Sequence, residues 1–219
     1  MDDDAPPVSS LERLRRRYDR LAPIYRAMEW VLFLPPGIRR QAVAQMELGP
    51  GDSAVEVGVG TGRNLPHLVG AVGPTGRVVG FDLSGGMLAR ARRRCARRGW
   101  GNVELIEADA AGADRPAGCA DGVLFALSYA AIPDHDAALD RAWAWLKPGG
   151  RLVVLDARLT DDLGGRIARP FVLALSRATV LGDPDKRAWE DLRRYTGDIE
   201  MTERLMGAYF ICRARKPAG

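Results

Sequence analysis

Residues 55–64 read VEVGVGTGRN: a short apolar run that holds one acid is followed by glycines at alternate positions. Such a run predicts a strand, and glycine lets the backbone after it take up positive φ and approach a ligand closely. The dinucleotide fingerprint G-x-G-x-x-G is not met, because the third glycine comes one residue early, at Gly62, and Arg63 stands in its place. No Lys-Ser/Thr pair follows, which excludes a P-loop. The stretch therefore predicts a ligand-binding turn between a strand and a helix.

Short apolar strands alternate with helical patterns around this loop. Helices are expected over 9–31, 35–48, 62–72, 84–99 and 134–146, and strands over 53–59, 76–82, 102–109, 122–128 and 151–157. The run 147–150, KPGG, is expected to end the last helix before the strand at 151. The strands are apolar throughout, as in a parallel sheet that is covered on both faces. The pattern predicts a doubly wound α/β fold, closed by a hairpin around Gly207.

Acids stand at or beside the ends of the first strands, where an open α/β sheet binds its ligands. Glu56 lies beside the glycine loop, where a carboxylate would repel a pyrophosphate and favour an ammonium group. Asp82 ends the second strand, a position that suits the hydroxyls of a ribose, and Asp109 ends the third, where it could accept a hydrogen bond from an exocyclic amine. Together these groups describe S-adenosylmethionine (SAM), and they count against a nicotinamide-dependent oxidoreductase, the alternative for such a loop.

Five stretches, in order, resemble the successive motifs of class I SAM-dependent methyltransferases: VEVGVGTGRN, VVGFDLSGGML, VELIEADA, ADGVLFALSYAAIPDHDAAL and LKPGGRLVVLD. The resemblance covers roughly residues 50–157, and it implies a Rossmann-like seven-stranded sheet of order 3-2-1-4-5-7-6 with strand 7 antiparallel. It also implies the residues that hold SAM. These are Glu56, Gly58, Gly60, Gly62 and Asn64 at the methionine end, Asp82, Leu83 and Met87 at the ribose and adenine, Asp109 and Ala110 at the adenine rim, and Ala126, Leu127 and Ser128 near the sulfonium.

The sequence defines the acceptor of the methyl group less sharply than it defines the cofactor. The segment YDRLAPIYRAMEW, residues 18–30, resembles the YDxxAxxYD stretch of quinone-biosynthesis and related phospholipid methyltransferases, in which it folds over the SAM pocket as a lid. Arg26 stands where that group usually has an acid. Candidate catalytic residues are Tyr18, Tyr25 and His135, although the tyrosines could equally be packing residues, and His135 lies in PDHD, which is rich in helix-capping groups. Methyl transfer needs a base only if the nucleophile has to lose a proton.

The amino-acid composition of the chain limits the classes of molecule that it is expected to bind. The chain has 219 residues, 47% of them apolar, a net charge of +4, three scattered cysteines and two histidines. This is the composition of a globular protein, and it favours a cytoplasmic location with reduced thiols and no histidine-based metal centre. The basic run of residues 90–98 is expected to be a solvated helix face away from the active-site edge, so no nucleic acid is expected. Residues 28–40 and 166–181 mix apolar and basic side chains, which favours an amphipathic substrate and leaves contact with the inner face of the membrane as an alternative to an ordinary lid.

We therefore expect one methyltransferase domain over 9–219 behind a disordered acidic tail, residues 1–8. Its parts are a helical cap over 9–48, a SAM-binding core over 50–157, a substrate-side insertion over 158–195 and a C-terminal hairpin over 196–219. The expected activity is methyl transfer to a small-molecule or lipid-like acceptor. A phospholipid amine, a quinone precursor and a non-enzymatic SAM-binding subunit are the alternatives, and the sequence leaves open whether the protein forms homodimers.

Overall fold

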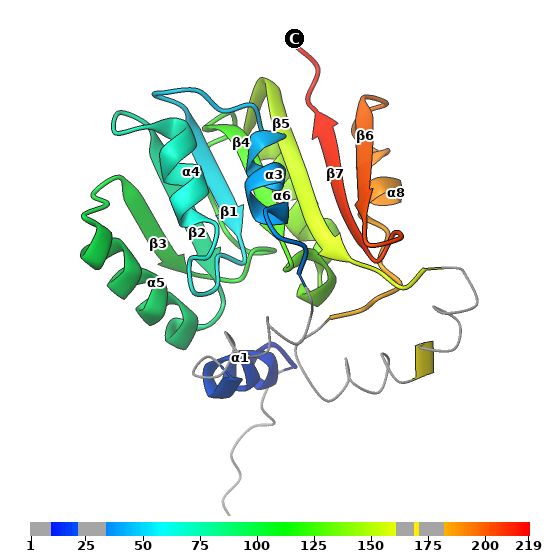
Figure 1. The fold of residues 1–219 in the computed structure, drawn as a ribbon, viewed down its shortest axis with the longest axis horizontal. Helices are drawn as coiled ribbons and strands as arrows, with labels where there is room; N and C mark the ends of the chain where they lie inside the picture. Colours follow the sequence, from blue (N-terminus) through cyan, green and yellow to red (C-terminus); the bar gives the residue numbers. More distant parts are fainter. Residues whose placement is uncertain (1–9, 22–33, 161–168, 171–181) are drawn as a thin grey trace, which may run out of the picture.

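Seven strands form one sheet in a computed structural model that describes residues 10–21, 34–160, 169–170 and 182–219 (Figure 1). The strand order is β3-β2-β1-β4-β5-β7-β6. All neighbours from β3 to β5 pair in parallel, whereas β7 is antiparallel to both β5 and β6. The predicted order and the antiparallel strand 7 are confirmed. The strands are β1 Ser53–Val57, β2 Arg77–Asp82, β3 Val103–Glu107, β4 Ala120–Ala126, β5 Leu146–Ala157, β6 Ile199–Arg204 and β7 Tyr209–Arg215.

Helices cover both faces of the sheet, which explains why its central strands are apolar throughout. One face packs against α3 Ile38–Ala44, α4 Leu65–Val72 and α5 Gly85–Arg98, and the other against α6 His135–Trp145 and α8 Ala188–Leu192. Strand β1 shows the alternation. Val55 and Val57 point into the α6–α8 core, whereas Ala54 joins the α3–α5 core.

Helix α1, Ser10–Leu21, lies across the carboxyl end of the parallel strands and packs against α5 (Figure 1). It is amphipathic, with Leu11, Leu14 and Tyr18 on its inner side. The predicted helix over 9–31 is thus observed as far as Leu21, and residues 22–33 lie outside the described part of the chain. In the described part, no helix is long and apolar enough to cross a bilayer.

Several predicted boundaries differ by a few residues, and the start of the fifth strand is wrong by the most. Helix α6 ends at Trp145, and β5 begins at Leu146 rather than after Gly150. Leu146 already pairs with Ala120 of β4, and the register then shifts before Gly122 pairs with Arg151. The KPGG run is therefore an irregular part of the strand, since its lysine is held by both carboxylate oxygens of Asp121 at 2.8 Å.

Candidate functional site

A pocket lies at the carboxyl ends of β1, β2, β3 and β4, with α1 forming part of its wall. It is the position at which an open α/β sheet binds a ligand. The residues predicted to hold SAM fall into two groups. Those on the pocket wall are Gly58, Gly60, Asp82, Leu83, Met87, Asp109, Ala110, Leu127 and Ser128. Those not on the wall are Glu56, Gly62, Asn64 and Ala126.

The glycines of the loop have positive φ, but they serve different purposes. A Cβ on Gly58 would come within 2.4 Å of the Cβ of Ser128, so this glycine lets the loops after β1 and β4 touch. A Cβ on Gly62 would come within 2.7 Å of Leu65, at the packing of the loop on α4. At Gly60 a Cβ would meet nothing within 4 Å. Only Gly60 therefore leaves free space on the pocket wall, as close approach of a ligand to the backbone requires.

Glu56 is completely buried next to this loop. Its Oε1 accepts a hydrogen bond of 2.5 Å from Asn64 Nδ2, and Asn64 Oδ1 accepts one of 3.0 Å from Arg39 on α3. Its Oε2 has no hydrogen-bond partner among the described residues. Burial raises the pKa of Glu56 to about 8, although the bond from Asn64 and the charge of Arg39 oppose the shift. A buried carboxyl with an unused oxygen beside a pocket is suited to receive a cationic group.

Asp82 connects the end of β2 to the glycine loop. Its Oδ2 accepts a hydrogen bond of 2.7 Å from the backbone N–H of Gly60, and its Oδ1 accepts one of 2.9 Å from Ser84. Burial raises its pKa to about 6, against the lowering effect of these two bonds. Asp109 lies across the same wall and accepts a bond of 3.2 Å from Ala111. Each carboxylate oxygen has a second lone pair, so both acids can still bind hydroxyl or amine donors.

The floor of the pocket is built by the end of β4. Ser128 is buried, and its hydroxyl donates a hydrogen bond of 2.6 Å to the carbonyl oxygen of Val57. Leu127 has a φ of 59°, which is uncommon for a residue with a side chain. A bond of 2.7 Å from its N–H to the carbonyl of Leu155 helps to hold this conformation. Strained backbone of this kind is concentrated at functional sites.

Helix α1 is joined to the pocket by an acid that sequence reasoning missed. Oδ1 of Asp19 accepts hydrogen bonds from the hydroxyl of Ser84, at 2.5 Å, and from the N–H of Gly86, at 3.0 Å. Ser84 is the predicted N-cap of α5 and accepts a bond of 3.1 Å from Met87. Arg15 adds an ion pair of 2.7 Å with Glu107. These contacts hold Leu11, Leu14 and Tyr18 against the pocket, whereas Tyr25 lies outside the described residues.

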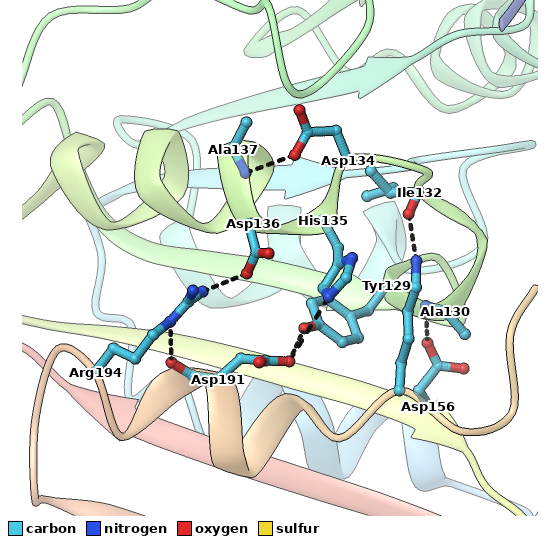
Figure 2. Close-up of polar contacts among 11 residues, drawn as sticks. Tyr129, Ala130, Ile132, Asp134, His135, Asp136, Ala137, Asp156, Asp191 and Arg194 are labelled. Atoms are coloured by element: carbon cyan, nitrogen blue, oxygen red, sulfur yellow. Dashed lines mark hydrogen bonds and ion pairs between the residues drawn. The ribbon is translucent and has the colours of Figure 1, made fainter.

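His135 does not line the pocket. It is the first residue of α6, whose N-cap is Asp134, with a hydrogen bond of 3.1 Å from Ala137. Its ring meets Tyr129 edge-on, and its Nε2 is 3.9 Å from Asp191 (Figure 2). His135, Asp136 and Asp191 could together surround a cation. We assign none, because Asp136 is paired with Arg194 at 2.6 Å and Asp191 accepts a bond of 2.5 Å from the Tyr129 hydroxyl.

The loop after β4, residues 128–133, is fixed from its far side by a buried carboxylate and a half-buried lysine. The carboxylate of Asp156 accepts a hydrogen bond of 3.0 Å from Ala130 (Figure 2), and the Lys186 ammonium donates one of 2.5 Å to the carbonyl of Ile132. Burial raises the pKa of Asp156 to about 6, and the charge of Lys186 opposes this shift. Because Ile132 and Ser128 line the pocket, this pair of residues shapes one of its walls.

The polar groups in and beside the pocket fit SAM. Space beside the Gly60 backbone, the unused oxygen of Glu56 and the two strand-end acids match the methionine, ribose and adenine parts that the resemblance assigned to them. Leu83 and Met87 supply apolar surface between the acids for a flat ring. SAM is the cofactor of this fold, and the roles of the individual residues remain our proposal.

Comparison with known proteins agrees with this geometry. Residues 54–150 match the family model of the methyltransferase domain. The chain is 28% identical to a demethylmenaquinone methyltransferase from Geobacillus kaustophilus over 217 residues, which cover 95% of this chain and 93% of the relative. It is 36% identical over 135 residues to nocamycin O-methyltransferase from Saccharothrix syringae, covering 62% and 48% of the two chains.

A solved structure of a SAM-dependent methyltransferase from Aquifex aeolicus has the same fold, with a TM-score of 0.63, 19% identity, and coverage of 86% of this chain and 97% of that one. The family match, the sheet order and the glycine loop with its strand-end acids together identify the chain as a class I SAM-dependent methyltransferase.

Proposed function

We propose that this methyltransferase acts on a hydrophobic quinone precursor that binds between α1 and the loop after β4. The observation that carries the proposal is the apolar character of this part of the pocket, where Leu11 and Leu14 of α1 meet Ile132 and Pro133. The similarity to demethylmenaquinone methyltransferases supports it, because it extends over nearly the whole of both chains.

SAM supplies an electrophilic methyl group on a sulfonium. The protein has to align the acceptor with that methyl and keep water away, since an in-line displacement depends chiefly on positioning. Leu11, Leu14 and Ile132 would exclude water from the acceptor. Of the predicted catalytic residues, Tyr18 is the one whose position on the wall is described, and we propose that its hydroxyl orients a hydroxyl of the acceptor.

Methylation of an oxygen atom of the acceptor is the second candidate. The local similarity to nocamycin O-methyltransferase favours it, because its identity of 36% exceeds that of the full-length relative. The departure at Arg26 from the quinone-type pattern also keeps this candidate open. A phospholipid amine is the third candidate, and it rests on the N-terminal resemblance alone.

The test is a competition between acceptors. The protein is incubated with SAM and a short-chain demethylmenaquinol, a simple phenol or phosphatidylethanolamine in detergent, and products are identified by mass spectrometry and by the atom that carries the new methyl. We expect C-methylation of the quinol and no turnover of its oxidised form. Exclusive methylation of the phenol oxygen or the lipid amine would replace this proposal with the corresponding alternative.

The domain division stays a prediction. We propose that residues 9–48 cap the pocket and that 158–195 complete its acceptor side. Within that insertion, residues 161–168 and 171–181 lie outside the described part of the chain.

A further inference from the structure

Positive charge is concentrated on two adjoining helices. Helix α1 carries five arginines against two acids, and α5 carries six arginines and no acid. Their net charge is therefore +9, whereas the whole chain carries +4, so that the other residues together carry −5. On an evenly charged surface, positive and negative side chains would be interspersed. In this protein the positive charge is instead concentrated on α1 and α5.

The arginines of the two helices lie on elements that pack against each other. On α5, Arg90, Arg93 and Arg97 follow Gly86 at helical spacing, so they lie in a row along one side of the helix. Gly86 is the residue that Asp19 of α1 contacts, which places α1 at the start of this row. On α1, the exposed arginines lie opposite the side that lines the pocket. We call this surface the arginine face and define it by Arg13, Arg16, Arg17, Arg20, Arg90, Arg93 and Arg97.

The part of the arginine face on α1 lies beside the pocket. The sequence alone predicted that the run on α5 would be a solvated face remote from the active-site edge, and no arginine of that run lines the pocket. Helix α1 adds arginines next to the pocket, because its inner side lines the pocket through Leu11, Leu14 and Tyr18 while its outer side carries arginines. Of the two acids of α1, Asp19 is turned to α5, and Glu12 is paired with Arg16 at 2.6 Å.

We propose that the arginine face docks the protein on an anionic lipid surface, with α1 and the pocket next to the bilayer. Arginines near such a surface are attracted by its negative potential without inserting into it. Binding to single-stranded nucleic acid generally uses aromatic side chains as stacking platforms. The one aromatic residue of the two helices, Tyr18, is on the pocket wall. The choice of a membrane over a nucleic acid also rests on the proposed lipid-like acceptor.

Vesicle co-sedimentation of the full chain, without SAM or acceptor, tests the docking. Vesicles of phosphatidylcholine alone are compared with vesicles that also contain phosphatidylglycerol, at low and high salt. We expect binding to the anionic vesicles only, and its loss at high salt because exposed charges are then screened. The variant R93Q/R97Q should bind about 25-fold more weakly, since each arginine contributes about fivefold at an anionic surface.

The matched control is R204Q/R215Q, which removes two exposed arginines from β6 and β7 and changes the net charge equally. Equal weakening in both variants, or binding that does not depend on phosphatidylglycerol, would overturn the proposal. So would tight binding of a single-stranded oligonucleotide by a chain that ignores the vesicles.

Activity measurements separate this proposal from the proposed function. R93Q/R97Q should methylate a detergent-dissolved acceptor at the normal rate and be slowed only when the acceptor is presented in anionic vesicles. If the wild-type chain binds the vesicles but methylates no quinol, the docking stands and the proposed substrate is wrong. If it methylates the quinol but does not bind the vesicles, the docking is wrong.

Discussion

Replacement of Glu56 by glutamine should stabilise the protein without ligand and weaken its binding of SAM. The carboxyl is fully buried, its Oε2 has no described partner, and burial raises its pKa to about 8 from an ordinary 4.5. In the folded state it is therefore mostly protonated at neutral pH, whereas in the unfolded chain it is ionised. Glutamine has the same shape and cannot ionise, so it removes the cost of burying a charge.

The sign and size of the effect follow from this pKa difference. A raised folded pKa contributes stability that is fully present below pH 4.5 and is lost as the pH rises through about 8. A shift of one unit corresponds to about 1.4 kcal/mol, so the wild type should lose about 5 kcal/mol over this range from Glu56 alone. Asp82 and Asp156, whose pKa values are raised to about 6, add losses of the same sign at lower pH in both proteins.

Urea denaturation at a series of pH values measures the difference directly. The free energies of unfolding of wild type and Glu56→Gln should agree near pH ~4 and diverge towards pH ~8, with the variant the more stable. Calorimetric titration with SAM should show the opposite order, because Glu56 can lose its proton when an ammonium group binds next to it, whereas glutamine cannot become negatively charged. Glu200→Gln, which removes an exposed acid of β6, is the matched control and should change neither measurement.

Two results would refute this reasoning. Stability curves that run parallel from acid to alkaline pH would mean that Glu56 is already ionised in the folded protein. Unchanged affinity of Glu56→Gln for SAM would mean that this carboxyl does not receive the ammonium group, whatever its pKa.

Other substitutions test the pocket. Gly60→Ala should fold, at a cost of about 1–2 kcal/mol for its positive φ, and calorimetry should show weak binding of SAM. Gly58→Ala should fail to fold stably in thermal melts, because its Cβ would approach Ser128 to 2.4 Å. Lys186→Met should lower kcat at least about tenfold through displacement of the pocket loop, with KM for SAM little changed and activity restored in part by Lys186→Arg. Lys147→Met, which removes a lysine from its ion pair with Asp121 at the other end of β4, should lower Tm alone. Tyr18→Phe should lower kcat on the quinol and leave SAM binding intact.

The parts of the fold that depend on local pattern could be predicted from the sequence. Apolar runs and glycine turns located the strands, and acids at strand ends located the pocket, because every parallel strand delivers its carboxyl end to one edge. The KPGG run was misjudged because Lys147 is held by Asp121 of the neighbouring strand, which no local rule records. Proline and glycine residues that would otherwise form a turn can lie in a strand when a tertiary contact stabilises the extended backbone.

Residues that act through distant contacts could not be found in this way. Asp19 caps a helix that begins more than sixty residues later, with a separation of 65 positions from Ser84. Arg39 reaches Asn64 across 25 positions, and Lys186 reaches Ile132 across 54. His135 shows the converse, because its residue type suggested a base, whereas the start of α6 places its ring against Tyr129 and outside the pocket wall.

The protonatable groups of the pocket limit the acceptors that the enzyme can use. In the described part of its wall these groups are Tyr18, Asp82, Asp109 and Ser128. In our assignment Asp82 and Asp109 bind the cofactor, and the Ser128 hydroxyl donates to Val57, so none of the three removes a proton from the acceptor in the transition state. A reaction in this pocket is therefore easiest for an acceptor that brings its own activation. A hydroquinone meets that requirement, because its hydroxyl groups make the neighbouring ring carbon electron-rich and can themselves ionise, and an oxidised quinone does not.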